Sequence, residues 1–217
     1  MTGLLLKDFR YMLTQKSFII LVLIIGFTLS LTQEDNDLFV IGYLAFMGIV
    51  LGMTSITMDD QEHNLTFLFT LPLSRRSYVL EKYLFTFLMG VLFCCIALAF
   101  ALVTRPFGNY QAPIDAILAT TCGTLAGAFL FTNIMIPLQF KFGAERARIA
   151  SFIAIGGFLA IIFIAALLVN VADALPMLQA IADLGAPVLI TIGCIVLLFS
   201  LAISIKFSLR IMKRKEL

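Results

Sequence analysis

Residue types that many catalytic and metal sites require are scarce in this sequence. The chain has a single histidine, His63, so a zinc site that needs two histidines cannot form. Its 4 cysteines all lie inside apolar runs without metal-ligand spacing, which argues against a disulfide framework or a metal site. No G-x-x-x-x-G-K-S/T run is present, so the chain alone does not hydrolyse ATP. We expect no catalytic residue, no metal and no cofactor bound by this chain, and therefore no enzyme.

Charge is also scarce. Only 13% of the 217 residues are charged and 61% are hydrophobic, with a mean hydropathy of +1.06. A soluble domain is about one quarter charged and about half apolar. Tryptophan is absent, so any aromatic belt at the membrane surface must consist of tyrosine and phenylalanine. The composition indicates an all-α integral membrane protein.

Six apolar segments are long enough, or nearly so, to cross the hydrocarbon core, which takes about 20 helical residues. They are residues 17–32, 38–58, 83–103, 114–136, 149–171 and 187–207. No A-x-A-like site follows the first segment, so we do not interpret it as a cleaved signal peptide. The aqueous parts leave no room for a soluble domain. We predict six spans in a single transmembrane domain, residues 1–217.

The basic residues predict the orientation of these spans. With the N-terminus inside, 14 of the 15 basic residues face the cytoplasm, and Arg105 is the exception. The opposite topology would place all 14 outside, against the positive-inside rule. We therefore predict a multi-pass protein of the plasma membrane with both termini in the cytoplasm.

Two amphipathic segments flank the spans. Residues 4–13 place Lys7 and Arg10 on one helical face and apolar side chains on another, which is typical of an interfacial helix leading into the first span. In residues 171–185, Leu175, Leu178 and Ile181 recur at helical spacing. We predict a short helix there, at the outer surface before the last span.

The connection 59–82 is the most informative stretch. It opens with three acids, continues with an apolar run through residue 71, breaks at Pro72 and restarts where Ser74 can cap the helix of the third span. One interpretation is a loop that follows the membrane surface. The other is a docking element for a cytoplasmic partner, in which a short inner helix joined to two spans conveys a push to the pathway.

Polar residues at membrane depth are few. Asn133 in the fourth span is either a pathway residue or an interhelical hydrogen-bond partner. No predicted span carries a paired set of Asp, Glu, Lys or His, which weakens a proton-driven carrier. Gly48 with Gly52, and Gly123 with Gly127, fit G-x-x-x-G, and each pair is either an internal contact or a dimer face.

Two stretches carry a resemblance to a known family. Residues 70–83 have the sequence TLPLSRRSYVLEKY, and residues 137–148 have the sequence PLQFKFGAERAR. With the six spans and the interfacial helix, they resemble the small permeases of type-two ABC exporters. Within that class the chain is most similar to bacterial peptide-efflux permeases such as the phenol-soluble modulin exporters. These also carry a leucine-proline-x-serine-arginine turn followed by a hydrophobe and a lysine, and residues 137–148 resemble their second cytoplasmic connection.

The resemblance implies a dimer of permeases, homomeric or heteromeric, driven by separate cytoplasmic ATPase subunits that hold ATP and magnesium. Residues 59–71 would supply the coupling helix that fits a groove of the ATPase, and residues 175–181 would match the outer helices that cap the exit. The pathway would lie between the two permease copies. The implied ATPase-coupling residues are Asp59, Asp60, Glu62, Leu65, Leu68, Leu71, Pro72, Ser74, Arg75 and Arg76.

The leading hypothesis is thus the permease subunit of an ATP-driven exporter, whose sparse pathway charge suits amphipathic or toxic peptides. A stand-alone secondary carrier or channel for hydrophobic compounds is the alternative, and a membrane enzyme or assembly factor is a third class. The expected partners are the ATPase, a second permease copy and the lipid bilayer, with no nucleic acid.

Overall fold

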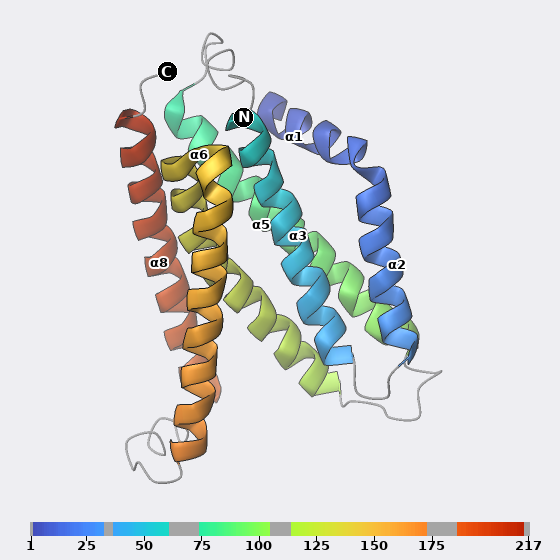
Figure 1. The fold of residues 1–217 in the computed structure, drawn as a ribbon. Coiled ribbons are helices and arrows are strands. Elements are labelled where there is room, and N and C mark those ends of the chain that lie inside the picture. Colours follow the sequence, from blue (N-terminus) through green and yellow to red (C-terminus); the bar gives the residue numbers. More distant parts are fainter. Residues whose placement is uncertain (1, 33–36, 61–73, 105–113, 173–185, 215–217) are drawn as a thin grey trace.

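The computed structural model describes residues 2–32, 37–60, 74–104, 114–172 and 186–214 (Figure 1). Within 144–172 and 186–190 only the backbone is described. The described residues form helices without a strand. The helices are α1 (Thr2–Thr14), α2 (Lys16–Thr32), α3 (Asp37–Asp60), α5 (Arg75–Thr104), α6 (Ile114–Ala172) and α8 (Ala186–Arg214). The all-α class predicted from the sequence is confirmed for these residues.

Four segments among the described residues are long and apolar enough to cross a membrane, namely Phe39–Asp60, Arg75–Thr104, Ile114–Gly143 and Thr191–Arg214. The pair α1 and α2 adds a fifth if it is counted as one bent span. The predicted span 149–171 falls on α6, where only the backbone is described. Six spans therefore stay a prediction, as does the short outer helix, because residues 173–185 lie outside the described residues.

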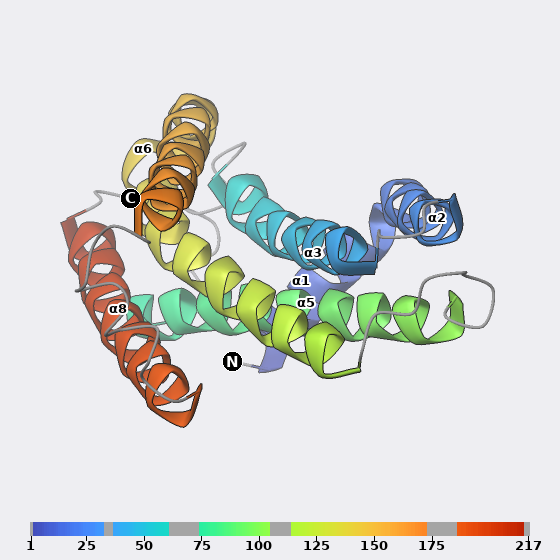
Figure 2. The same cartoon turned by 90° about the horizontal axis from the view of Figure 1, so that it is seen from below.

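The chain bends between α1 and α2 by 71°. At the bend the Gln15 amide donates to the Met12 carbonyl at 3.0 Å, and the Phe18 amide donates to the Gln15 carbonyl at 3.1 Å. Helix α1 has 13 residues, or about 20 Å at 1.5 Å per residue, too short to cross a core of about 30 Å. A helix thus covers the predicted interfacial segment 4–13, and it lies across the end of the bundle (Figures 1 and 2).

Helices α3 and α5 approach most closely where Gly48 and Gly52 face α5. A Cβ added at Gly48 would lie 2.7 Å from the Met89 carbonyl oxygen, and one added at Gly52 would lie 2.7 Å from the Thr86 Cα. Small residues at this spacing let two backbones pack against each other within a membrane. This G-x-x-x-G pair is therefore an internal contact, whereas a Cβ added at Gly123 or Gly127 would meet nothing within 4 Å.

Helix α6 changes direction at Gly143. With φ 72° and ψ 177°, this residue occupies a region open essentially to glycine alone. The part after Gly143 runs back toward the opposite end of the molecule (Figure 1). The apolar segment that the sequence predicts as the fourth span ends at residue 136, but the helix continues through Pro137 to Gly143. It resumes directly after Gly143, so the predicted connection 137–148 is helical on both sides of this residue.

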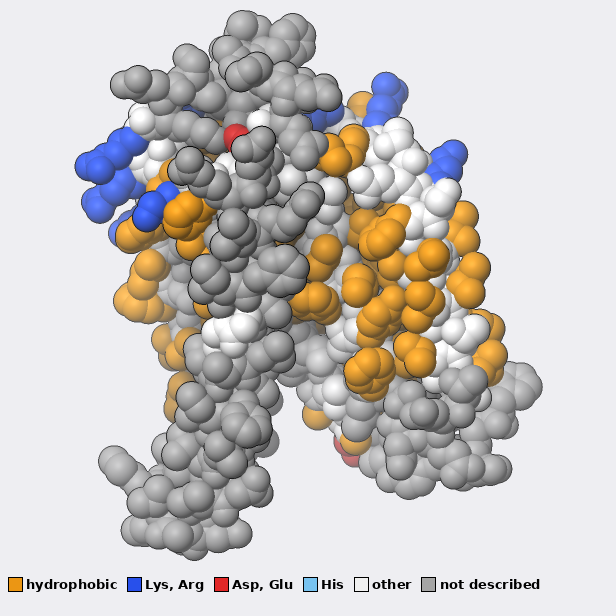
Figure 3. All heavy atoms as spheres, in the orientation of Figure 1, with side chains coloured by type: hydrophobic (Ala, Val, Ile, Leu, Met, Phe, Trp, Pro, Cys, Tyr) orange, Lys and Arg blue, Asp and Glu red, His pale blue; other side chains and the backbone are white. Residues whose placement is uncertain are grey.

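The start of α1, the end of α3, the start of α5, the bend of α6 and the end of α8 share one end of the molecule (Figure 1). These are the parts that the positive-inside rule assigns to the cytoplasm. The described lysine and arginine side chains on the face shown in Figure 3 gather at this end, and apolar side chains cover the helices below it. We refer to it as the basic end.

Candidate functional site

A buried ammonium group joins three helices at the basic end. Lys82, on α5, has a side chain with 0% relative exposure. Its Nζ lies 2.5 Å from Asp8 Oδ2 on α1 and 2.7 Å from Asp59 Oδ2 on α3. It also donates a hydrogen bond of 3.1 Å to Ser55 Oγ on α3. Desolvating a lysine is costly unless it is paired and hydrogen-bonded, and both conditions are met here.

Two further groups complete the arrangement. Lys7 Nζ lies 2.5 Å from Asp59 Oδ1 and 3.4 Å from Asp8 Oδ1. The Tyr78 hydroxyl donates to Asp59 Oδ2 at 3.2 Å, and its ring lies under Lys82 Nζ at 5.4 Å. We call Lys7, Asp8, Asp59 and Lys82, with Ser55 and Tyr78, the ionic cluster. Its two lysines balance its two aspartates.

Helical spacing explains why these side chains meet. Ser55 and Asp59 are four residues apart on α3, and Tyr78 and Lys82 are four residues apart on α5. Residues at this spacing lie on one helical face, one turn apart. The close packing of α3 on α5 therefore brings two polar pairs together, and α1 adds Asp8. Except for Ser55, the members of the cluster lie outside the predicted spans, among residues assigned to the interfacial helix and the connection, so the sequence analysis did not bring them together.

The carboxyl of Asp8 illustrates the electrostatics. It belongs to α1, outside the four long spans, and is 1% exposed. Burial acts to raise its pKa, but the charge and hydrogen bond of Lys82 and the charge of Lys7 outweigh burial, so the pKa of Asp8 lies below its usual value. Asp8 is therefore held as a carboxylate, the form that the cluster needs.

Glu81 lies beside the cluster but is bound differently. Its Oε2 is 3.8 Å from Lys82 Nζ, and neither buried carboxyl oxygen has a hydrogen-bond partner among the described residues. The charges of the cluster already cancel without it. The contact of Glu81 with Lys82 is longer than those of Asp8 and Asp59, so Glu81 contributes less to holding the three helices together.

The predicted coupling residues at the helix ends take distinct positions. Asp59 lies inside the ionic cluster, and Asp60 lies beside Gly143, where an added Cβ would come within 2.7 Å of Asp60 Oδ2. Ser74 caps α5, as predicted, because its Oγ accepts the Ser77 amide at 3.1 Å. The remaining members of the set between the two helices lie outside the described residues: Glu62, Leu65, Leu68, Leu71 and Pro72.

The first two residues of α5 differ from each other in their contacts. Arg75 Nη1 donates to the carbonyls of Met212 at 2.8 Å and Lys213 at 3.0 Å. The last carbonyls of a helix have no partner within the helix, so this contact caps α8 and fastens it to α5. Arg76 is exposed. Within this part of the chain, Arg76 is thus the predicted coupling cation that faces outward.

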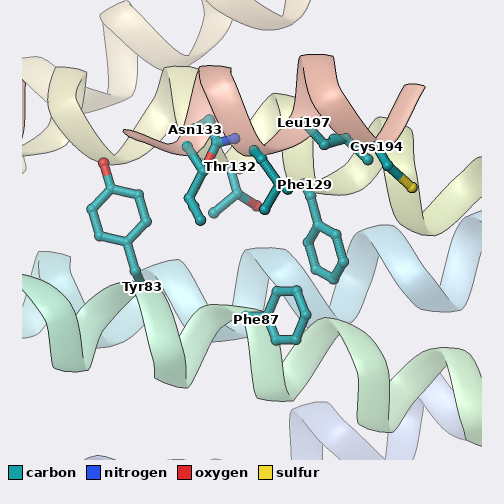
Figure 4. Close-up of a pocket in the computed structure, with 9 residues that line it drawn as sticks. Tyr83, Phe87, Phe129, Thr132, Asn133, Cys194 and Leu197 are labelled. Carbon is teal, nitrogen blue, oxygen red and sulfur yellow. The ribbon is translucent and has the colours of Figure 1, made fainter. Parts of the chain in front are cut away.

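A cavity of about 310 Å³ lies between α5, α6 and α8. Tyr83 and Phe87 line it from α5, Asn133 from α6 and Cys194 from α8 (Figure 4). Its lining also includes Phe129, Thr132, Leu197, Leu198 and Leu201. Pockets of about 300–1,000 Å³ with mostly apolar walls and a few polar groups are typical of ligand sites. The cavity can hold an apolar group and offers it few hydrogen bonds.

The polar end of this cavity is built around Pro137. A proline cannot donate the helical hydrogen bond to the residue four positions earlier, here Asn133. The Ser204 hydroxyl on α8 donates to that carbonyl instead, and the Asn133 side-chain amide donates to Ser200 Oγ at 3.0 Å. Asn133 thus makes the interhelical hydrogen bond that the sequence offered as one alternative. Its role in a pathway stays a prediction.

Tyr83 extends this polar line to α5. Its hydroxyl lies 2.5 Å from Ser204 Oγ and 2.8 Å from Ser208 Oγ. Because Ser204 gives its proton to Asn133, Tyr83 donates to Ser204 and Ser208 donates to Tyr83. Ser200, Ser204 and Ser208 recur every four residues, a spacing that places them on one face of α8. That spacing is the sequence signal that could have revealed this contact.

Comparison with known proteins adds the family. The sequence model described as "ABC-2 family transporter protein" matches residues 3–213. The chain belongs to the ABC-2 transporter family. The searches of curated proteins and of solved structures gave no match. Membership confirms the permease class that the sequence resembles, and leaves its cargo open.

As an ABC-2 permease, the chain is a multi-pass membrane protein and the membrane part of an ABC transporter. The family implies an ATPase partner. The ionic cluster is in this setting a structural joint between helices. At the basic end α1 meets two of the four long spans, those of α3 and α5, and the cavity lies deeper among α5, α6 and α8.

Proposed function

We propose that this ABC-2 permease is the membrane subunit of an ATP-driven exporter that moves amphipathic, antimicrobial or toxic peptides out of the cell. It works with a second permease copy and with cytoplasmic ATPases that hold ATP and magnesium. One observation carries the coupling part of this proposal: the ionic cluster locks α1, α3 and α5 together at the two helix ends that residues 61–73 connect.

The position of the cluster supports coupling through that connection. Helix α3 ends at Asp60, one residue after Asp59, and α5 begins at Arg75. A force applied between these ends therefore acts on two spans at once. Lys82 holds both ends and α1 in one unit, and Arg75 fastens α5 to the end of α8. Ion pairs join α1, α3 and α5, and the hydrogen bonds of Arg75 add α8. A displacement of the connection by the ATPase would therefore move four helices together rather than bend one.

The lining of the cavity supports an apolar or amphipathic cargo. Phe87 and Phe129 stack with ring centroids 4.1 Å apart, and none of the described residues that line the cavity is charged. The polar groups of an ion or a sugar would lack hydrogen-bond partners in this cavity. Burying each such group would cost about several kcal/mol. The apolar face of an amphipathic peptide has no such polar groups and would not incur this cost.

Reconstitution tests the proposal. The tagged chain is purified with its ATPase in mild detergent and placed in liposomes, and uptake of a fluorescent amphipathic helical peptide into inside-out vesicles is measured. We expect uptake that needs ATP and magnesium and stops with a non-hydrolysable ATP analogue. Uptake of a glucose or sodium tracer alone would overturn the cargo assignment.

One observation favours the alternative of a stand-alone secondary carrier. The ionic cluster, with Glu81, collects five carboxyl and ammonium groups that the sequence analysis did not bring together. These groups lie at the basic end of the molecule, and the lysines and aspartates of the cluster are all paired, which suits a joint better than a proton relay. Transport by the purified chain without an ATPase, driven by an imposed pH gradient, would favour the carrier instead.

A further inference from the structure

A second hollow lies at the basic end, away from the ionic cluster and the cavity. It is a groove of about 500 Å³ between the bend of α6 and the last two turns of α8. Its lining combines three cations with apolar side chains: Phe140, Lys141, Phe207, Arg210, Ile211 and Arg214. None of these described lining residues is acidic, although the chain has nearly as many acids as bases.

The three cations are available to an outside anion. Lys141, Arg210 and Arg214 are exposed, and no ion pair with another described residue involves them. Lys141 Nζ lies 5.3 Å from the centre of the Phe142 ring, a contact that leaves its protons free for an acceptor. Arginine forks match the geometry of a phosphate, and a lysine adds a point charge. The groove therefore fits a phosphate group.

An apolar stripe leads from the groove along α8. Phe207 forms its first member and is 57% exposed, followed by Ile203 at 47%, Phe199 at 68% and Val196 at 51%. The steps of three or four residues place these side chains along one helical face. They cover residues 196–207, whose ends are separated by about 16 Å at 1.5 Å per residue, or half of a hydrocarbon core of about 30 Å. The stripe therefore has the length of one lipid leaflet.

We propose that this groove and stripe form a binding site for an anionic phospholipid of the cytoplasmic leaflet. The phosphate contacts Lys141, Arg210 and Arg214, and an acyl chain lies along Phe207, Ile203 and Phe199. Charge complementarity selects the anion, and the continuous stripe selects a lipid over a soluble phosphate or an acidic protein. Basic pockets between spans on the cytoplasmic side are a recognised place for anionic headgroups. The proposal does not depend on the cargo.

Native mass spectrometry of the full chain in neutral detergent tests this site. Phosphatidylglycerol and phosphatidylcholine with the same acyl chains are titrated separately, and the bound fraction is counted. We expect phosphatidylglycerol to bind more tightly, and the R210Q/R214Q double variant to lose about tenfold or more of its affinity, since two charge-assisted contacts are removed. R10Q/K16Q removes two exposed cations at the same end and is the matched control, expected to change affinity less than twofold.

A second pair of measurements separates the lipid from other anions. F199S/I203S keeps every cation and is expected to weaken phosphatidylglycerol binding severalfold, while inorganic phosphate at the same concentration displaces none of the lipid. Equal losses in R210Q/R214Q and R10Q/K16Q would overturn the proposal, as would full displacement by phosphate. So would loss of ATPase co-purification in R210Q/R214Q with lipid binding unchanged, because the groove would then be a protein contact.

Discussion

At the scale of single residues, Lys82 decides how the basic end is held. Its ammonium contacts a carboxylate on α1 and another on α3 while its own helix is α5. A surface ion pair would contribute little, with a median below about 1 kcal/mol. A buried one behaves differently, because removing one partner leaves the other charge buried without compensation. The cluster is therefore sensitive to the loss of any one member.

Replacement of this lysine is the direct test. We expect Lys82→Met to lower the free energy of unfolding by about 3–5 kcal/mol, because Asp8 and Asp59 lose their shared partner in a buried site. Thermal unfolding of the detergent-purified protein, followed by circular dichroism, measures the change. A Lys82→Met variant that unfolds at the wild-type temperature would show that the cluster does not hold the helices.

Glu81 provides a contrast one residue away. Lys7 and Lys82 already balance Asp8 and Asp59, and the Glu81 oxygens have no hydrogen-bond donor among the described residues. We expect Glu81→Gln to change the free energy of unfolding by less than about 1 kcal/mol in either direction, within the range of changes that break no paired group. Asp8→Asn, by the same charge count, should destabilise the protein clearly. Equal effects of the two substitutions, in the same unfolding assay, would contradict this charge count.

The residues of the cluster mark the limit of sequence reasoning at this scale. The sequence alone explains the cluster's four charged residues as ordinary charges of an interfacial helix or a loop. Only the packing of α3 on α5 brings Ser55, Asp59 and Lys82 within contact of one another. Ser74, by contrast, was predictable as a cap, because capping depends on the consecutive residues 74–77 and on no tertiary contact.

At the scale of elements, the apolar runs predicted the helices well and their ends less well. Spans need a long apolar segment, and that property is local. The position where the first part of α6 ends depends on a tertiary contact. The helix continues past Pro137 because the Ser204 hydroxyl on α8 donates to the Asn133 carbonyl that the proline leaves without a helical partner. The two G-x-x-x-G pairs show the same limit. Gly48 and Gly52 contact α5, whereas Gly123 and Gly127 meet open space, and the motif alone does not distinguish them.

The reversal of α6 depends on one glycine. We expect Gly143→Ala to cost about 1–3 kcal/mol, because φ 72° with ψ 177° is strained for any residue with a Cβ, which would also press on Asp60. Gly127→Ala is the control, since its added Cβ meets nothing within 4 Å and alanine favours a helix. The unfolding temperatures of both variants in detergent check this. If Gly127→Ala were the more damaging change, the bend would not require glycine.

At the scale of the whole molecule, the structure combines two features. The ionic cluster joins helices at the basic end, and an apolar cavity lies farther from that end. Family, helical class and membrane nature were all accessible from the sequence, because they depend on composition and on motifs along the chain. The cavity was not, since three helices supply its walls. Asn133 was the only one of its residues that stood out by polarity. Residues 59–82 remain the predicted docking element.

Filling the cavity tests its role in transport. Cys194 lines the cavity, whereas its neighbour Ile195 is 61% exposed and is not part of the lining. We expect Cys194→Phe to reduce peptide transport severalfold, because the larger ring occupies the space that an apolar cargo group needs, with ATPase binding unchanged. Ile195→Phe should transport at the wild-type rate. Uptake into inside-out vesicles gives the readout, and equal rates for the two variants would place the pathway elsewhere.

Docking at the connection 59–82 is tested by introducing charge at Leu68 and Leu71. On the proposed function, Leu68 and Leu71 are apolar contacts in a groove of the ATPase, and two glutamates there would each have to lose their hydration, an expensive step without a partner. We therefore expect Leu68→Glu with Leu71→Glu to abolish co-purification of the ATPase. Neither leucine belongs to the joint formed by Lys82, Asp8 and Asp59. The variant should therefore keep the wild-type unfolding temperature and membrane insertion. Leu68→Ala with Leu71→Ala removes contact area without adding charge and should give an intermediate loss. If the ATPase stayed bound to the glutamate variant, Leu68 and Leu71 would not be docking contacts. The ATPase would then bind another part of the basic end.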